Sequence, residues 1–285
     1  MSNHTRVVAF TQENIKSKPN EDWFRALPDN GVFAVADGVT LPRINGVYPE
    51  ISSAHAATRF CATTTAVLAH RKDSIFTAFL LANLEIAALN CSHGITAKTV
   101  DYSHHDYLAC VGIAGRLSKE NPRRFEYGYI GDCGIFVYDE DYFPKFLSEN
   151  PVDVLERFRE GWGFQEKNEE RIFWRGMLRN RPHSSFMTQG VLTGELVALA
   201  YFKTGYVDLA HGDTLVLFSD GIYPFIFDRG FRELVSTLVQ DICDEKIKDN
   251  KLREYIKEAA SDLRKRGVGN LDDDKTCIAL RINGT

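Results

Sequence analysis

Four short acidic patterns share one feature: each lies at an end of an apolar run that is expected to form a strand. The four patterns are Asn20-Glu21-Asp22, Asp37-Gly38, Asp220-Gly221 and Asp272-Asp273-Asp274. Asp37 follows an apolar run at residues 32–36 that contains two valines and a phenylalanine, a composition typical of a buried strand. The glycine after the aspartate lets the chain turn without a Cβ clash. We therefore expect the carboxylates to lie where strands leave the core.

If these strand ends meet, several negative charges share one small volume. Such a cluster is stable only when a cation or protons neutralise it. Carboxylate oxygens suit Mg²⁺ or Mn²⁺, and none of the four patterns contains a His or Cys pair that would indicate zinc. Two such ions, about 3.5–4 Å apart, bind a phosphate group and activate a bridging water. The patterns therefore point to hydrolysis of a phosphate ester.

The composition is that of an ordinary globular protein: 285 residues, 44% hydrophobic, 26% charged, with a net charge of −5. A negative net charge argues against nucleic-acid binding over a broad surface. The first residues show no apolar signal-peptide core, and the apolar region at 75–89 is interrupted by Asn83 and Glu85 and too short to span a bilayer. We expect a cytoplasmic protein without a membrane partner. Its six cysteines form no C-x-x-C pair and are expected to be reduced thiols.

Apolar periodicity and turn residues predict many strands in hairpin order, with helices arriving in runs. Strands are expected at 7–10, 23–27, 32–37, 107–117, 125–130, 135–138, before Asp220 and at 276–282, and helices from Ser52 or Ser53 to 71, from an Asp73 cap to 91, at 231–240 and at 250–266. This order predicts an α+β fold of antiparallel sheets with helices packed outside. It lacks the βαβ alternation of a Rossmann fold, and no Walker loop is present.

One domain, residues 1–285, is expected, with a variable insert at about 139–205 that mixes charged, aromatic and turn-forming residues. Pro151 is expected to open one helix of the insert and residues 169–181 to form another. Arg171, Arg175 and Arg179 would then share one helical face. One hypothesis is that this face lies beside the active site and selects acidic or phosphorylated partners; the other is a solvated face paired with Glu169 and Glu170.

The ordered set of motifs resembles the metal-dependent PPM (PP2C-type) serine/threonine phosphatases. The set is Asn20-Glu21-Asp22, Val35-Ala36-Asp37-Gly38, Gly131-Asp132, Ser219-Asp220-Gly221 and Asp273-Asp274-Lys275-Thr276, and the resemblance spans Asn20 to Ile282. It implies an α-β-β-α sandwich in which two antiparallel sheets pack face to face, with helices outside and a metal centre at one edge between the sheets.

The resemblance also implies a role for each site residue. Asp37 would bridge two Mn²⁺ or Mg²⁺ ions, Gly38 would contact one through its carbonyl, and Asp220 and Asp273 would hold the other. Glu21 would act through a metal-bound water, and Asp132 would lie near a third ion. A bridging water would attack the phosphorus of phosphoserine or phosphothreonine in a protein substrate, so Asp37, Asp220 and Asp273 are the catalytic candidates.

Three positions depart from the family pattern. Lys16, Ser17 and Lys18 stand where a phosphate-clamping arginine is common, and a lysine supplies charge without a bidentate fork. Val39 stands where some members have a histidine as general acid, and Pro224 where an aspartate often helps the third metal. We therefore expect two firmly bound ions and a weak or absent third, with Lys16 and Lys18 as candidate phosphate-binding residues.

Other functions remain open from the sequence. A binding protein could keep the fold without turnover, as a pseudophosphatase, or the substrate could be a small phosphorylated metabolite. Cys110 and Arg116 have the C-x₅-R spacing of cysteine phosphatases, but the stretch is predicted to be a strand rather than a phosphate loop. The sequence does not predict an oligomeric state.

Overall fold

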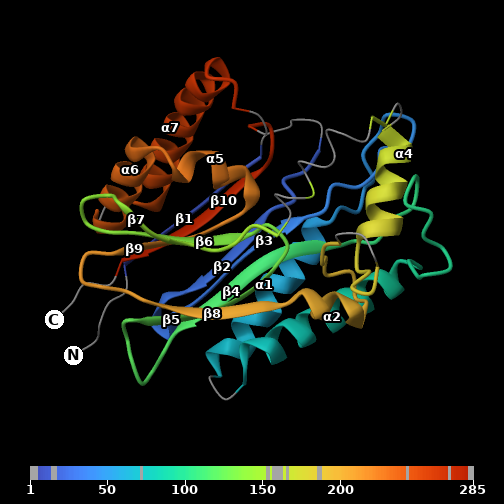
Figure 1. Cartoon of the computed structure of the whole chain (residues 1–285), viewed down its shortest axis with the longest axis horizontal. Helices are drawn as coiled ribbons and strands as arrows, with labels where there is room; N and C mark the ends of the chain where they lie inside the picture. The colour runs from blue at the N-terminus through green and yellow to red at the C-terminus, as the bar shows by residue number, and fades with distance from the viewer. Residues whose placement is uncertain are drawn as a thin grey trace.

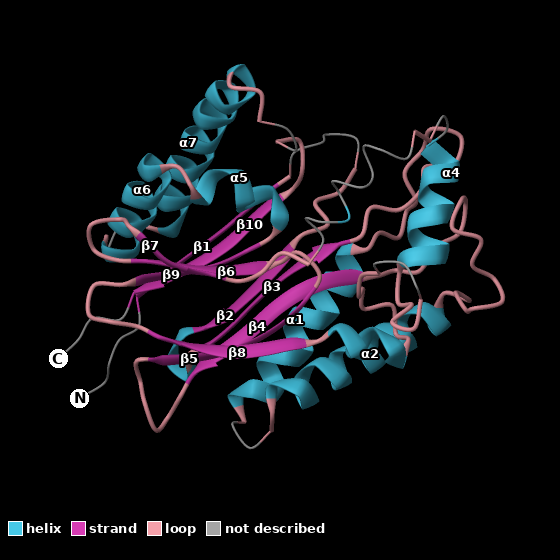
Figure 2. Cartoon of the chain, viewed as in Figure 1, coloured by secondary structure: helices cyan, strands magenta, loops and turns pink. Residues whose placement is uncertain are grey.

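Two five-stranded antiparallel sheets lie at the centre of the molecule, and helices lie outside them (Figures 1 and 2). The computed structural model describes residues 6–13, 18–70, 73–151, 155, 163–164, 167–184, 188–241, 244–268 and 271–281. The α-β-β-α sandwich predicted from the sequence is confirmed.

The first sheet has the order β1-β10-β9-β6-β7. Its strands are β1 (Arg6–Gln12), β10 (Lys275–Arg281), β9 (Thr214–Phe218), β6 (Gly134–Tyr138) and β7 (Pro144–Leu147). Along β9, Leu215 and Leu217 belong to the core between the sheets, while Val216 and Phe218 belong to the core under the outer helices. Because both faces are covered, this antiparallel sheet has nearly continuous apolar runs rather than alternating apolar and polar residues.

The second sheet has the order β2-β3-β4-β5-β8. Its strands are β2 (Trp23–Leu27), β3 (Val32–Gly38), β4 (Cys110–Leu117), β5 (Arg124–Ile130) and β8 (Lys203–Asp208). β2 and β3 form a hairpin whose turn ends at Gly31, which has φ of +63° and so needs the freedom of glycine. Helices α1 (Ala54–Ala69) and α2 (Ile75–Ser92) cover the outer face of this sheet: α1 packs on β2, β3 and β4, and α2 on β5 (Figure 1).

The outer face of the first sheet is covered by α6 (Arg229–Gln240) and α7 (Glu245–Lys265), with the short α5 (Tyr223–Ile226) beside them (Figure 1). Phenylalanines of α5 and α6, Phe225 and Phe231, fill the core between these helices and the sheet. Shorter elements complete the described part of the chain: α4 (Lys167–Ile172), a π-helix (Phe173–Leu178) and 3₁₀-helices at Pro28–Asn30, Leu196–Tyr201 and Asp220–Ile222.

Several local predictions differ from the structure. The cap of α2 is Ser74 rather than Asp73, because the Ser74 hydroxyl accepts a hydrogen bond from the Thr77 amide at 3.1 Å. Ser53 precedes α1, but its hydroxyl accepts from the Ala109 amide at 3.4 Å instead of capping the helix. The expected helix at 250–266 begins five residues earlier, at Glu245.

The region 139–205 is not wholly separate from the sheets. β7 lies inside it and pairs with β6, and β8 begins inside it and pairs with β5. The expected helix at 169–181 is an α-helix to Ile172 and then a π-helix to Leu178. The helix expected after Pro151 falls almost entirely outside the described residues.

Helix α2 is apolar on nearly all sides. The helix has 18 residues, three more than the apolar region recognised in the sequence. By length and composition alone it could cross a membrane. Of that stretch, 44% is buried, and α2 packs against α1. A packed core helix passes the same test, so the pattern is weak evidence for a membrane segment.

Candidate functional site

Three of the predicted site aspartates lie at strand ends that the two sheets bring together. β9 and β10 are antiparallel neighbours, with Phe218 opposite Cys277, so Asp220 after β9 meets Asp273 before β10. Asp37 lies near the end of β3 in the other sheet. The carboxylates therefore gather at one edge between the sheets, as the motifs predict.

Close backbone contacts hold these strand ends together. The Gly38 amide donates to the Glu21 carbonyl at 3.1 Å, and the Glu21 amide donates to Asp274 Oδ2 at 3.0 Å. A Cβ on Gly38 would lie 2.8 Å from the Glu21 carbonyl oxygen, and one on Gly221 would lie 1.9 Å from the Asp274 carbonyl oxygen. Both glycines are therefore required for the backbones to approach so closely.

The carboxylates repel one another in a buried environment. Burial raises the pKa of Asp37 well above its usual range, and the charges of Asp22, Asp220, Asp273 and Asp132 raise it further. Burial, followed by the charges of Asp132, Asp273 and Asp22, does the same for Asp220. For Asp22, burial together with Asp274 and Asp273 raises the pKa to about 7, although a hydrogen bond from Ser219 opposes the shift. Asp132, which follows β5, is thus electrostatically part of the same cluster.

The chemistry of this cluster fits a divalent cation. Asp22 Oδ1 and Asp220 Oδ1 are buried, and neither has a hydrogen-bond partner among the described residues. Unpaired anionic oxygens in a buried cluster are ligands of the kind that Mg²⁺ and Mn²⁺ prefer. Within the described ranges, no three carboxylate, imidazole or thiol groups are placed to hold one ion as their side chains lie. The donor set fits, and side-chain rotation is needed to gather it around an ion.

Lys18 supplies a positive charge inside the site. Its Nζ lies 3.0 Å from Asp274 Oδ2, 3.3 Å from Glu21 Oε2 and 3.9 Å from Asp273 Oδ1, and the residue is only 7% exposed. Burial opposes this charge, but Asp274, Glu21 and Asp273 together raise the pKa of Lys18 above its usual range. Of the two lysines considered for phosphate binding, Lys18 is therefore at the site with its charge directed at carboxylates, and Lys16 lies outside the described residues.

Glu21 is held by residues that the sequence reasoning missed. The Tyr48 hydroxyl donates to Glu21 Oε1 at 2.5 Å, and the Ser53 amide donates to the same oxygen at 3.3 Å. Asp22 accepts from the Ser219 hydroxyl at 2.6 Å. Asp22 and Ser219 stand inside recognised motifs and could have been assigned from them, whereas nothing in the sequence around Tyr48 signals its contact.

Two arginines of the predicted insert lie beside this site. Arg179 donates to both oxygens of Asp106, at 3.0 and 3.3 Å, and Arg175 donates to Asp106 Oδ2 and to the Thr40 carbonyl. Arg179 is 4% exposed and Asp106 also 4%. The interpretation as a solvated face paired with Glu169 and Glu170 is therefore wrong for Arg175 and Arg179. Both arginines tie the insert to Asp106, which precedes β4, and Arg175 also ties it to Thr40 in the loop after β3.

The structure contradicts two further candidates. Cys110 and Arg116 both lie in strand β4, where burial raises the pKa of the Cys110 thiol and Arg116 pairs with Glu126 at 3.1 Å, so the cysteine-phosphatase interpretation is wrong. Asp228, four residues beyond Pro224, has both carboxylate oxygens engaged elsewhere: one caps α6 through the Gly230 amide, and the other accepts from the Tyr255 hydroxyl at 2.9 Å.

Comparison with sequences of known proteins gives a match for part of the chain. Residues 178–283 match the family model described as stage II sporulation protein E (SpoIIE). No curated protein sequence matches the chain.

Several solved structures share the fold across the whole chain at low sequence identity. The catalytic domain of the serine/threonine phosphatase PstP, in complex with two manganese ions, is 18% identical, with coverage of 98% of this chain and 99% of that chain and a TM-score of 0.59. The serine/threonine phosphatase Stp1 from Staphylococcus aureus is 13% identical, with coverage of 98% and 96% and a TM-score of 0.59. RsbX in complex with magnesium is 11% identical, with coverage of 98% and 96% and a TM-score of 0.51. The resemblance of the sequence motifs is therefore confirmed: the chain has the fold of the PP2C-type (PPM) phosphatases, and its residues 178–283 match the SpoIIE family.

Proposed function

We propose that the chain is a metal-dependent phosphatase that hydrolyses phosphoserine and phosphothreonine in proteins. The observation that carries this proposal is the set of mutually repelling carboxylates, Asp22, Asp37, Asp132, Asp220 and Asp273, gathered from both sheets at one edge. Such a cluster lowers stability, and a protein with a purely structural role gains nothing from it. Clusters of this kind at a cleft edge are expected where charge serves function.

The roles of the residues follow from their positions. We assign Asp37, the Gly38 carbonyl, Asp220 and Asp273 to two Mn²⁺ or Mg²⁺ ions, with Glu21 and Asp132 at outer positions. When bound, such ions offset the charge of phosphoryl oxygens and lower the pKa of a coordinated water. Tyr48 and the Ser53 amide fix the orientation of Glu21. Lys18, beside Asp273 and Thr40, contributes a positive charge for a phosphate group.

The solved neighbours support metal dependence, because PstP is described with two manganese ions and RsbX with magnesium. They also support a protein substrate, because PstP and Stp1 are serine/threonine phosphatases. At 11–18% identity these likenesses establish the fold, and a phosphatase assay tests the activity.

One observation favours a second candidate, a binding protein that has kept the fold. The Lys18 ammonium already neutralises part of the acidic cluster through Asp274 and Glu21. An internal cation of this kind reduces the need for a metal ion, and a chain that recognises a phosphoprotein without hydrolysing it could use the same arrangement.

A phosphatase assay separates the two candidates. An aryl phosphate and a phosphothreonine peptide are each incubated with the protein in Mn²⁺, in Mg²⁺ and in EDTA, and Asp37→Asn serves as the matched inactive variant. The proposal predicts hydrolysis that requires the ion and is lost in Asp37→Asn, while circular dichroism shows that the variant stays folded. Hydrolysis that persists in EDTA, or near-normal turnover of Asp37→Asn, would contradict the metal mechanism. Peptide binding without hydrolysis in either ion would support the binding protein.

A further inference from the structure

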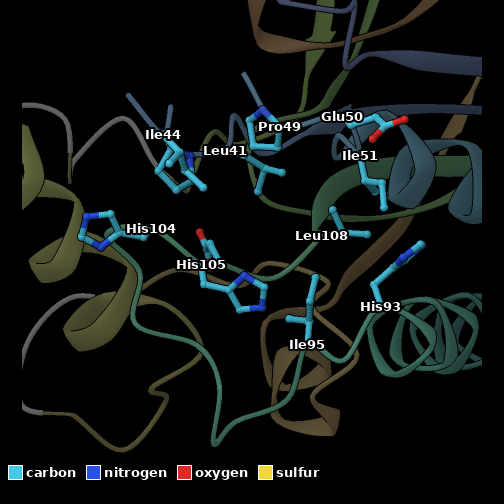
Figure 3. Close-up of a pocket in the computed structure, with 12 residues that line it drawn as sticks. Leu41, Ile44, Pro49, Glu50, Ile51, His93, Ile95, His104, His105 and Leu108 are labelled. Atoms are coloured by element: carbon cyan, nitrogen blue, oxygen red, sulfur yellow. The ribbon is translucent and has the colours of Figure 1, made fainter. Parts of the chain in front are cut away.

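An apolar cavity of about 270 Å³ lies beside the loop that follows β3, and we name it the Leu41 cavity. Apolar side chains of Leu41, Ile44, Ile51, Ile95 and Leu108 surround it in Figure 3. Pro42 and Pro49 complete the apolar lining, and His93, His104 and His105 contribute imidazoles. The volume is slightly below the range of small-molecule pockets, about 300–1,000 Å³. It is therefore of a size to receive a side chain rather than a whole cofactor.

One wall of the Leu41 cavity is the loop that also organises the acidic site. The Tyr48 hydroxyl accepts from the Leu41 amide at 2.9 Å and donates to Glu21 at 2.5 Å, so a single hydroxyl joins the cavity wall to the site. Thr40, next to Leu41, accepts a hydrogen bond from Lys18 at 3.3 Å. The loop at residues 39–53 thus contributes both to the lining of the cavity and to the contacts of the acidic site.

The separation of the two sites along the chain limits their distance. Leu41 is three residues after Gly38, and three residues span at most about 10–11 Å even when fully extended. An extended peptide with its phosphorylated residue at the acidic site therefore reaches the cavity with a side chain that is at most about three residues away.

The charges around the cavity do not oppose a phosphorylated chain. The lining contains two carboxylates, Glu50 and Asp106, and the two arginines that pair with Asp106, Arg175 and Arg179, offset their negative charge. Ile44, at the mouth, is 47% exposed and held by a tight antiparallel bridge to Val47. The exposed Ile44 side chain continues the apolar lining of the cavity, and contiguous apolar surface, unlike a single exposed residue, marks sites that contact other proteins.

From these observations we infer that the Leu41 cavity receives an apolar side chain of the phosphoprotein substrate that lies within about three residues of the phosphorylated serine or threonine. The inference rests on the proposed function, because the phosphorylated residue must lie at the acidic site. It adds a substrate class: phosphoproteins with a leucine-like residue at that spacing, on one side of the phosphorylated residue.

The test compares matched phosphothreonine peptides that carry leucine or alanine at each position from three before to three after the phosphothreonine. Burial of an extra aliphatic side chain corresponds to about a tenfold or larger rise in kcat/KM. The inference predicts that rise for leucine on one side of the phosphothreonine, at a position within three residues of it, and no rise on the other side. Equal rates for leucine and alanine at every position would overturn it.

Two variants connect the preference to the cavity. Ile44→Asp places a charge at the mouth, and Ile51→Trp fills the interior; each should reduce the leucine-to-alanine ratio to near one. The matched control is Val47→Asp, because Val47 is 69% exposed on the same turn but does not line the cavity, and it should keep the ratio. A ratio between two peptides is insensitive to a general loss of folded enzyme. A preference that survives both cavity variants would overturn the inference.

Failure of the inference is distinguishable from failure of the proposed function. If the protein hydrolyses no phosphate ester, calorimetry with the same peptides still measures binding, and tighter binding of the leucine peptide would support the cavity while rejecting the phosphatase. If Ile44→Asp converts a dimer to a monomer in light scattering and leaves the peptide ratio unchanged, the surface is an interface between copies of this chain and the inference is wrong.

Discussion

Replacing Asp22 by asparagine should change how the stability of the protein depends on pH. Asp22 is buried, its Oδ1 has no hydrogen-bond partner in the described structure, and its pKa is raised from 3.8 to about 7 by burial and then by neighbouring carboxylates. Asparagine has nearly the same shape and can still accept the hydrogen bond that Ser219 donates at 2.6 Å. The substitution therefore removes a charge with little change in packing.

The sign of the change in stability with pH follows from proton linkage. Because the folded-state pKa lies above that of the unfolded chain, the folded protein binds more protons between pH 4 and pH 7. The free energy of unfolding of the wild type thus falls as pH rises through this window. Each pKa unit corresponds to about 1.4 kcal/mol, so the Asp22 contribution changes by about 3 kcal/mol between pH 4.5 and pH 8.

The assay is urea denaturation of wild type and Asp22→Asn in EDTA at both pH values. The stability of the variant relative to the wild type should rise by about 3 kcal/mol from pH 4.5 to pH 8. Any cost of burying the asparagine amide is independent of pH and cancels in this comparison. Mn²⁺ added to the wild type at pH 8 should restore stability, by about 2.7 kcal/mol at a concentration one hundred times Kd.

A second buried aspartate provides the control. Asp213 is 2% exposed, but it pairs with Lys145 at 2.6 Å and accepts from the Ala210 amide at 2.8 Å. Asp213→Asn loses a charged hydrogen bond and should lower stability at pH 8 by about 1–3 kcal/mol. If Asp22→Asn showed the same stability difference from wild type at pH 4.5 and pH 8, the carboxylates would not be repelling one another and the reasoning would be refuted.

Two other substitutions test how the site is supported. Gly221→Ala should abolish phosphatase activity and lower stability by about 1–3 kcal/mol, because the added Cβ would lie 1.9 Å from the Asp274 carbonyl oxygen. The control is Gly176→Ala, which should be tolerated because its Cβ would lie 3.5 Å from the nearest atom. Urea denaturation and an aryl phosphate assay measure both effects, and an active Gly221→Ala enzyme would show that the backbones need not approach so closely. Asp106→Ala leaves Arg175 and Arg179 buried without their partner and should lower the free energy of unfolding by about 3–5 kcal/mol. The control Glu233→Ala breaks an exposed pair with Arg229 and should lower it by less than about 0.5 kcal/mol. Equal costs in denaturation would mean that the Asp106 cluster does not anchor the insert.

Those parts of the site that sit at strand ends could be predicted from the sequence. Asp37 and Asp220 are recognisable because an apolar run must end where a carboxylate and a glycine follow, and this signal is local in the chain. The prediction that Asp37 and Asp220 lie close together required only that the sheets be antiparallel and packed against each other. Strand limits were likewise predicted closely where apolar runs are sharply bounded, as for β2, but less closely at β4, where the buried segment 107–109 precedes the strand.

Contacts between distant segments could not be predicted in this way. Tyr48 lies 27 residues from Glu21, in a loop without periodicity, and its role depends on how that loop folds over the site. Asp106 and Arg179 are 73 residues apart, and the helical spacing of the arginines gave no sign of which carboxylate they would reach. The change from α-helix to π-helix at Phe173, in the segment that contains Arg175, also has no local signal.

Arg175 connects the helical segment of the insert to the loop after β3. Its guanidinium donates both to Asp106 and to the Thr40 carbonyl of that loop. The backbone that carries the carboxylates is fixed by strands and by close contacts at Gly38 and Gly221. The loop, by contrast, contacts Glu21 through Tyr48 on one side and lines the Leu41 cavity on the other. A change in the insert that moves Arg175 must therefore move the loop, and with it both the orientation of Glu21 and the shape of the cavity. Substrate preference is thus expected to follow the sequences of the loop and of residues 167–178, whereas the chemistry follows the strand ends.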